Sequence, residues 1–152
     1  MIEVEVFGRE RLGERDLAPG LIERLCARAA SAAGLDGGHV AIVFVEAGEI
    51  ARLNATHRGR AGATDVLSFP IDGAEPLHGG PPRELGDVVI CPEHTVDVAE
   101  AVVHGVLHLL GMDHEVDGGE MLARQDEILR WEGLVGGPSE ELAEGCEGVD
   151  GG

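Results

Sequence analysis

The sequence contains no lysine and no tyrosine, so all eleven of its Lys/Arg cations are arginines. Against these stand 29 aspartates and glutamates, and the formal net charge at pH 7 is -18. A surface of this sign repels polyanions as a whole, because nucleic-acid phosphates are held chiefly by cations. Any binding of a nucleic acid must therefore depend on a local cluster of arginines.

Cysteines and long apolar runs are also scarce. The three cysteines, Cys26, Cys91 and Cys146, are far apart and form no C-x-x-C pair, which argues against a disulfide framework or a thiolate zinc site. No stretch reaches the roughly 18 consecutive apolar residues of a membrane helix. Residues 1–10 lack the basic and apolar regions of a secretion signal. We therefore expect reduced thiols in a soluble, cytoplasmic protein that does not engage a membrane.

What the sequence does contain is a series of strand and helix patterns. Alternating or β-branched runs predict strands, and apolar residues spaced by three and four predict helices. A stretch rich in glycine and proline, residues 73–82, predicts the most flexible loop of the body. Together they predict an α+β fold, a mixed β-sheet of about four strands packed with helices. The expected strands are residues 2–7, 40–45, 65–71 and 85–91, and the expected helices are residues 20–34, 48–56, 96–110 and 121–131.

The length of 152 residues suits one domain with its own core. We place this domain at residues 1–131. Residues 132–152 contain six acidic residues and no cation, which predicts a disordered acidic tail.

Three histidines within residues 104–114 form the clearest candidate site. His104 and His108 are four residues apart, so on a helix they lie one turn apart on the same face. If that helix continued, His114 would lie about 9 Å beyond His108 and about 240° round the axis. Gly111 can adopt the left-handed conformation that reverses the chain after a helix, which would return His114 toward the pair. The spacing predicts one metal ion on His104, His108 and His114, held by a helix in the C-terminal half and the turn after it.

The histidine spacing matches the H-E-x-x-H-x-x-G-x-x-H pattern of metzincin zinc peptidases at all but one position. Where those peptidases have the glutamate that acts as general base, this chain has Gly105. A peptidase mechanism therefore lacks its base, whereas a three-histidine site with an open fourth position can still activate water. Two roles remain open for Asp113. It could accept a hydrogen bond from a ligand imidazole, or it could be a turn residue. The alternative for His104 and His108 is a pair of hydrogen-bonded core histidines, which so apolar a helix disfavours.

A basic segment precedes the histidines. No acidic residue occurs between Glu49 and Asp65, whereas Arg52, Arg58 and Arg60 fall in this stretch. In so acidic a chain this is the natural docking place for a phosphate. The alternative, which charge alone favours, is a solvated helix end whose arginines pair with nearby carboxylates.

Three further motifs accompany the histidine segment. Residues 53–59 read LNATHRG, residues 64–70 read TDVLSFP and residues 85–90 read LGDVVI. With the histidine segment, and in this order, they resemble the YbeY family of rRNA-maturation endoribonucleases. The resemblance implies an α+β fold, one zinc ion (Zn²⁺) on the three histidines and single-strand-specific endoribonuclease activity. It also implies a role in maturing the 3′ end of 16S rRNA and in ribosome quality control.

The resemblance also implies roles for single residues. Arg58 is expected near the metal as a catalytic residue, together with the ligand His114. Independently of the resemblance, we expect Arg58, Arg60 and Ser68 to bind the substrate phosphates. For Ser68, a structural role in its strand is an equal alternative. The expected partners are single-stranded rRNA and the small ribosomal subunit, with a basic ribosomal protein as a further candidate for the acidic surface.

The chain departs from the family pattern in two ways. His57 and Met112 stand where the family commonly has tyrosines, and the helical stretch that usually precedes the metal helix is missing. Two other functions remain open. One is a metal-dependent peptidase or amidase with a base such as Glu93 or Glu115, and the other is a non-catalytic ribosome-associated factor whose metal only holds the last turn to its helix.

Overall fold

The computed structural model describes residues 2–35, 37–59, 62, 64–72, 83–112 and 119–134, without the side chain of Arg58. Its core is a four-stranded sheet in the order β1-β2-β4-β3. β1 (Ile2–Phe7), β2 (Gly38–Phe44) and β4 (Glu84–Ile90) are parallel, and β3 (Val66–Pro70) runs antiparallel to β4 at the edge. The predicted α+β fold with a mixed sheet of about four strands is confirmed. The predicted loop at residues 73–82 lies outside the described residues.

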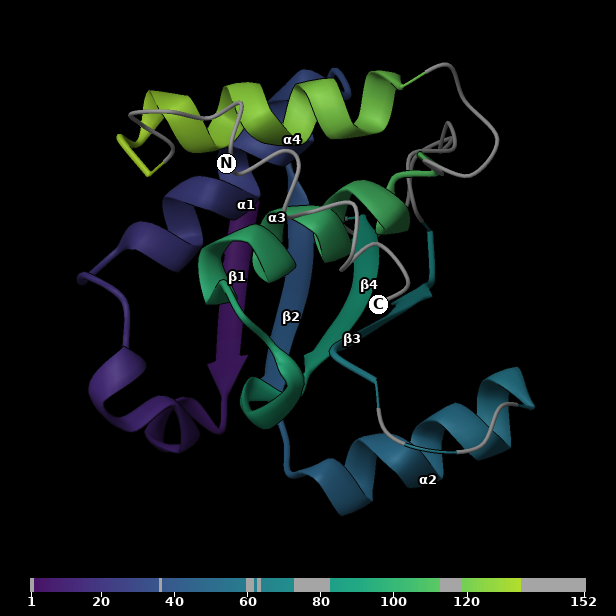
Figure 1. Cartoon of the computed structure of the whole chain (residues 1–152). Coiled ribbons are helices and arrows are strands. Elements are labelled where there is room, and N and C mark those ends of the chain that lie inside the picture. Colours follow the sequence, from purple (N-terminus) through teal and green to yellow (C-terminus); the bar gives the residue numbers. More distant parts are fainter. Residues whose placement is uncertain are drawn as a thin grey trace.

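Helices cover the two faces of the sheet unequally. α1 (Leu21–Ala32), α3 (Val98–Leu109) and α4 (Glu120–Trp131) pack together over one face and enclose the main core. α2 (Ala47–Arg58) lies apart from them (Figure 1) and covers a smaller apolar cluster on the other face. The strands alternate between the two cores, as β2 shows with Ile42 in the first and Val43 in the second. All four predicted helices are present.

Two short 3-10 helices were not predicted. η1 (Arg9–Arg15) follows β1, and η2 (Pro92–His94) is the single turn between β4 and α3. The guanidinium of Arg15 joins them, because it donates to the carbonyl oxygens of Pro92, at 2.7 Å, and of Thr95. This clamp holds the short segment that leads from β4 to α3.

β4 contains a bulge that brings β3 and α3 close to the strand. The register against β2 shifts between His39 and Val40, and Gly86 adopts φ +139°. A Cβ atom at Gly86 would lie 2.4 Å from the Phe69 carbonyl oxygen and 2.9 Å from Leu109 Cδ2. Only glycine suits both this φ and this approach, so Gly86 fixes how closely β3 and α3 pack on β4.

The C-terminal end of the described fold extends past α4. The Leu134 amide donates to the Leu129 carbonyl at 2.9 Å, and the Glu132 carboxylate accepts from Arg24 at 3.1 Å and from Arg28 at 2.7 Å. Of the predicted tail, Glu132 therefore pairs with α1 and Leu134 closes the turn that ends α4, and residues 135–152 lie outside the described residues. Within the described ranges, no helix has both the length and the apolar composition needed to span a bilayer.

Candidate metal centre

α3 is buried on nearly every side and opens to the surface at two histidines. Its N-terminus is capped by Asp97, whose carboxylate accepts from the Glu100 amide at 3.1 Å. From residue 101 to residue 110 only His104 and His108 are half-buried, and every other residue is buried. The helix thus presents two imidazoles, one turn apart, from an otherwise apolar element.

The two imidazoles are placed to share a metal ion. Their ring centroids lie 4.8 Å apart, and their planes are inclined by 68°. Two rings on one tetrahedral zinc ion, with Zn–N distances of about 2.0–2.1 Å, have centroids about 5 Å apart. The pair therefore fits the predicted metal. The third predicted ligand, His114, lies outside the described residues, and within those residues no three His, Cys, Asp or Glu side chains form a metal-binding group.

The turn after α3 has the predicted form. Gly111 adopts φ +95°, and its amide donates to the His108 carbonyl at 3.0 Å. The Met112 amide donates to the Leu107 carbonyl at 3.1 Å. These two bonds form a Schellman motif, which reverses the chain directly after the histidine pair. Asp113 lies beyond this point, outside the described residues.

Gln125 is a site residue that the sequence analysis missed. Its Oε1 lies 2.9 Å from His104 Nδ1, and the residue is only 8% exposed. It comes from α4, where it occupies the buried stripe formed by Met121, Ile128 and Leu129. A polar residue within that apolar stripe is the signal that could have identified it, because a buried amide needs a partner.

Gly105 faces the sheet rather than the histidine pair. A Cβ atom at this position would lie 2.4 Å from Val88 Cγ1 and 3.3 Å from Val66 Cγ2. The Gly105 carbonyl accepts a hydrogen bond of 2.9 Å from the Ser68 hydroxyl, which ties the edge strand β3 to α3 beside His104. No side chain fits at the place where a metzincin has its base. The predicted substrate residue Ser68 lies on β3, with its hydroxyl hydrogen directed to the Gly105 carbonyl of α3.

Of the two carboxylates considered as peptidase bases, Glu93 and Glu115, the structure describes only Glu93. Glu93 caps α2, since its Oε1 accepts from the Ala47 amide at 3.0 Å. It precedes α3, whereas His108 is in the last turn, about 15 Å along the helix from its first residue. Glu115 lies outside the described residues. Glu93 is therefore a cap of α2 and does not lie beside His108.

The basic segment follows the C-terminal half of α2. Arg52 pairs with Glu49 on the same helix, as the solvated-face alternative predicts. Arg58 is the last residue of α2, and Gly59 ends the helix at φ +68°. The buried Asn54 donates from Nδ2 to the Gly62 carbonyl at 3.0 Å, which ties the following segment back to the helix. Arg60 and the Arg58 side chain lie outside what the structure describes.

The remaining arginines do not form an open basic surface. Each arginine whose side chain is described takes part in an interaction within the protein, mostly with a carboxylate. These are Arg9, Arg11, Arg15, Arg24, Arg28, Arg52, Arg83, Arg124 and Arg130.

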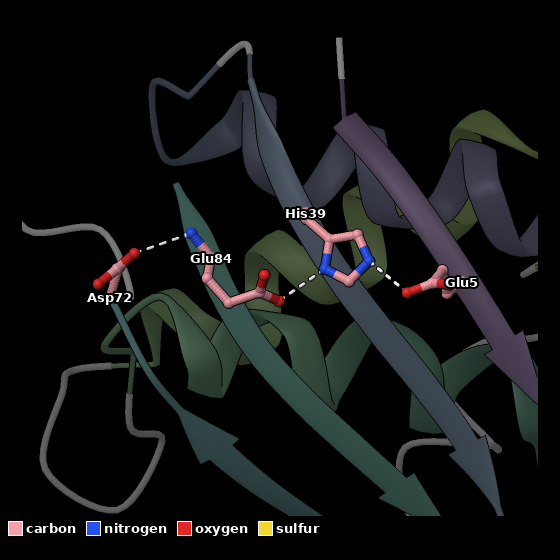
Figure 2. Close-up of polar contacts among 4 residues, drawn as sticks. All are labelled: Glu5, His39, Asp72 and Glu84. Atoms are coloured by element: carbon pink, nitrogen blue, oxygen red, sulfur yellow. Dashed lines mark hydrogen bonds and ion pairs between the residues drawn. The ribbon is translucent and has the colours of Figure 1, made fainter. Parts of the chain in front are cut away.

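A second ionisable cluster lies across three strands (Figure 2). His39 on β2 contacts Glu84 on β4 through Nδ1 at 2.6 Å and Glu5 on β1 through Nε2 at 2.8 Å. The hydrogen bond to Glu84, with a smaller one to Glu5, raises the pKa of His39 above its usual value despite partial burial. Both ring nitrogens face carboxylates, so this cluster is an ion-pair network rather than a metal site.

The described cysteines are inert. Cys26 and Cys91 are free and buried, and burial raises the pKa of the Cys26 thiol to about 12. A protonated, buried thiol is a poor nucleophile and metal ligand. Cys146 lies outside the described residues.

Comparison with known proteins gives one consistent family. The family model described as Endoribonuclease YbeY matches residues 13–132. A protein named Endoribonuclease YbeY from Macrococcus caseolyticus is 39% identical over 130 residues, which cover 74% of this chain and 84% of that protein. One of the same name from Rubrobacter xylanophilus is 39% identical over 132 residues, covering 83% and 93%. A solution structure from Thermotoga maritima aligns with a TM-score of 0.48 and 25% identity, over 90% of this chain and 95% of that one.

Proposed function

Because the chain belongs to the YbeY endoribonuclease family, we propose that it is a metal-dependent endoribonuclease that cuts single-stranded RNA. The observation that carries the proposal is the placement of His104 and His108, which alone interrupt the buried surface of the second half of α3. The proposed role is maturation of the 3′ end of 16S rRNA and ribosome quality control in the cytoplasm. Its partners would be single-stranded rRNA and the small ribosomal subunit, including a basic ribosomal protein.

The proposed metal is zinc, with His104, His108 and His114 as its ligands. Support comes from the donor set, since neutral imidazoles are common zinc ligands, and from the 4.8 Å between the first two rings. When bound, a zinc ion on three imidazoles supplies a Lewis acid that polarises a phosphate oxygen and lowers the pKa of water. The chain itself contributes the ligands, their orientation and the apolar surroundings of α3.

Arg58 is the proposed partner of the scissile phosphate. A guanidinium can hold two phosphate oxygens at once and stabilise the negative charge that grows in the transition state. α2, which ends at Arg58, and α3 pack on opposite faces of the sheet. The edge strand β3 contributes side chains to the apolar clusters on both faces. Ser68 on β3 contacts α3 at Gly105, and Arg60 is proposed as a second phosphate contact.

The proposal is tested by metal content and product. The full chain is purified without a nickel column, its zinc is measured by elemental analysis, and it is incubated with a single-stranded RNA, the matching duplex and casein. We expect about one zinc per chain and cleavage of the single strand alone. His108→Ala should lose both zinc and cleavage, and Arg58→Ala should keep zinc but slow cleavage by about 100-fold.

Arg52→Ala is the matched control, because Arg52 lies on the same helix but pairs with Glu49. It should cleave RNA as the wild type does. Cleavage that survives in His108→Ala would overturn the proposal. Cleavage of casein would instead favour a peptidase, and zinc uptake without either product would favour a non-catalytic ribosome-associated factor.

A further inference from the structure

We propose that Gln125 is a positioning residue of the metal centre: it fixes the His104 ring with the hydrogen on Nδ1, so that Nε2 is directed to the metal. The inference rests on the proposed function, since it treats His104 as a metal ligand. It assigns a task to a residue of α4, a helix on which the sequence analysis placed no site residue.

The contact itself sets the direction of the hydrogen bond. Gln125 Oε1 lies 2.9 Å from His104 Nδ1. An amide oxygen only accepts, so the hydrogen between them belongs to the imidazole. A neutral imidazole carries one N–H, and with that hydrogen on Nδ1 the lone pair available to a metal is on Nε2.

Burial stabilises the hydrogen bond between Gln125 and His104. Gln125 is 8% exposed and lies on the same stripe of α4 as the buried Met121 and Ile128. A buried amide without a partner is costly, so an apolar side chain would suit this stripe better if packing were its only task. Because α4 packs against α3, the Gln125 amide can contact His104. His108 lies one turn further along α3.

The bond also limits the rotation of the ring. His104 and His108 meet at 68° with centroids 4.8 Å apart, which is the spacing that one shared ion requires. A ring that turned about its Cβ–Cγ bond would lose this relation. Partners of this kind on ligand histidines typically contribute about 10–100-fold to metal affinity.

The test uses four variants of the full chain. Gln125→Met keeps the length of the side chain and removes the acceptor, and Gln125→Glu keeps an acceptor oxygen. Ile128→Val, one turn away on the same stripe, weakens the packing of α4 without touching the hydrogen bond. His108→Ala tests the metal site itself. Circular dichroism confirms that each variant is folded.

Two readouts are measured. Zinc affinity is determined by competition with a chromophoric chelator, and the protonated nitrogen of His104 is identified by ¹H–¹⁵N correlation NMR of the metal-free protein. We expect Nδ1–H in the wild type, in Gln125→Glu and in Ile128→Val, and a shift toward Nε2–H in Gln125→Met. Zinc affinity should fall about 10–100-fold in Gln125→Met and stay within a few-fold of the wild type in Gln125→Glu and Ile128→Val.

The outcomes separate this inference from the proposed function. If zinc binds the wild type and is lost in His108→Ala, while Gln125→Met changes neither affinity nor ring protonation, the inference alone is overturned. A wild-type His104 protonated at Nε2 also overturns it, because the amide would then be the donor. If the wild type binds no zinc, the proposed metal site fails, and the NMR comparison still decides whether Gln125 fixes the ring.

Discussion

Gly105 on α3 and Val88 on β4 approach so closely that a Cβ atom built on the glycine would lie 2.4 Å from Val88 Cγ1. Val88 is fully buried and cannot move aside into solvent. The glycine therefore does two things at once. It lets α3 rest directly on the sheet, and it excludes the glutamate that a metzincin peptidase has at this place in its metal helix.

Gly105→Ala is expected to lower the free energy of unfolding by about 1–3 kcal/mol, because overpacking outweighs the helix propensity gained. Gly48→Ala on α2 is the matched control. Its Cβ would have no neighbour within 4 Å, so the same substitution should be neutral or stabilising by up to about 1 kcal/mol. Urea denaturation measures both. A Gly105→Ala variant as stable as the wild type would show that the contact relaxes freely.

A second prediction concerns Glu132, just beyond α4. The hydrogen bond from Arg28, followed by that from Arg24, lowers the pKa of this carboxyl below its usual value. A lowered pKa means that the contribution to stability is present above the unfolded pKa of about 4.5 and is lost as the pH falls through the folded value. The two arginines are 49% and 38% exposed, so solvent screening limits the contribution to about 1 kcal/mol.

Glu132→Gln should therefore be less stable than the wild type by about 1 kcal/mol at pH 7, and the difference should shrink toward pH 3. Glu127→Gln, which breaks an exposed pair with Arg124 on the same helix, should change stability by only a few tenths of a kcal/mol. Thermal or urea unfolding at several pH values checks this. A difference that grows on acidification would contradict the assignment.

The elements with a clear local period could be predicted from sequence. The β-branched run of β2 and the apolar spacing of α1 and α3 each appear where expected, because these patterns report which face of an element is buried. The Gly111 turn was predictable for a similar reason, since a glycine directly after an apolar helix is a strong stop signal. The pairing of His104 with His108 followed from helix geometry alone.

The contacts that depend on distant segments could not be predicted. Arg15 reaches Pro92 across 77 positions of sequence, and His104 meets Gln125 only because α4 packs on α3. The start of the predicted tail at residue 132 was set by composition. Composition cannot show that Glu132 lies between two arginines of α1, 108 and 104 positions away.

The affinity of the protein for single-stranded RNA should depend on salt concentration more weakly than is usual for a nuclease. The arginines with described side chains are engaged within the protein, so the proposed phosphate contacts reduce to Arg58 and Arg60. Two contacts to a single strand give a slope of log K against log salt near −1.4, from about −0.7 per contact. Fluorescence anisotropy with a labelled single-stranded RNA measures this slope. The slope should change from about −1.4 to about −0.7 in Arg58→Ala and stay unchanged in Arg52→Ala.

The last prediction follows from the Glu5–His39–Glu84 cluster (Figure 2). Glu84 first, and then Glu5, raise the pKa of His39, so the folded state holds this proton more tightly than the unfolded chain does. The resulting stability is fully present below the unfolded pKa of about 6.5 and is lost as the pH rises through the folded value. Glu3, opposite His39 in the β1 register, adds a further carboxylate on β1.

His39→Gln should therefore be less stable than the wild type at pH 5.5, by about 1 kcal/mol or less, because the Glu5 and Glu84 side chains are 59% and 40% exposed and solvent screens both pairs. The difference should fall toward zero between about pH 6.5 and pH 9. Comparing each variant with the wild type at the same pH cancels the titration of the other histidines. Glu5→Gln leaves Glu84 in place and should show a smaller difference of the same sign. If the His39→Gln difference were constant from pH 5.5 to 9, the imidazole would be bound neutral, and the three strands would be joined by ordinary hydrogen bonds.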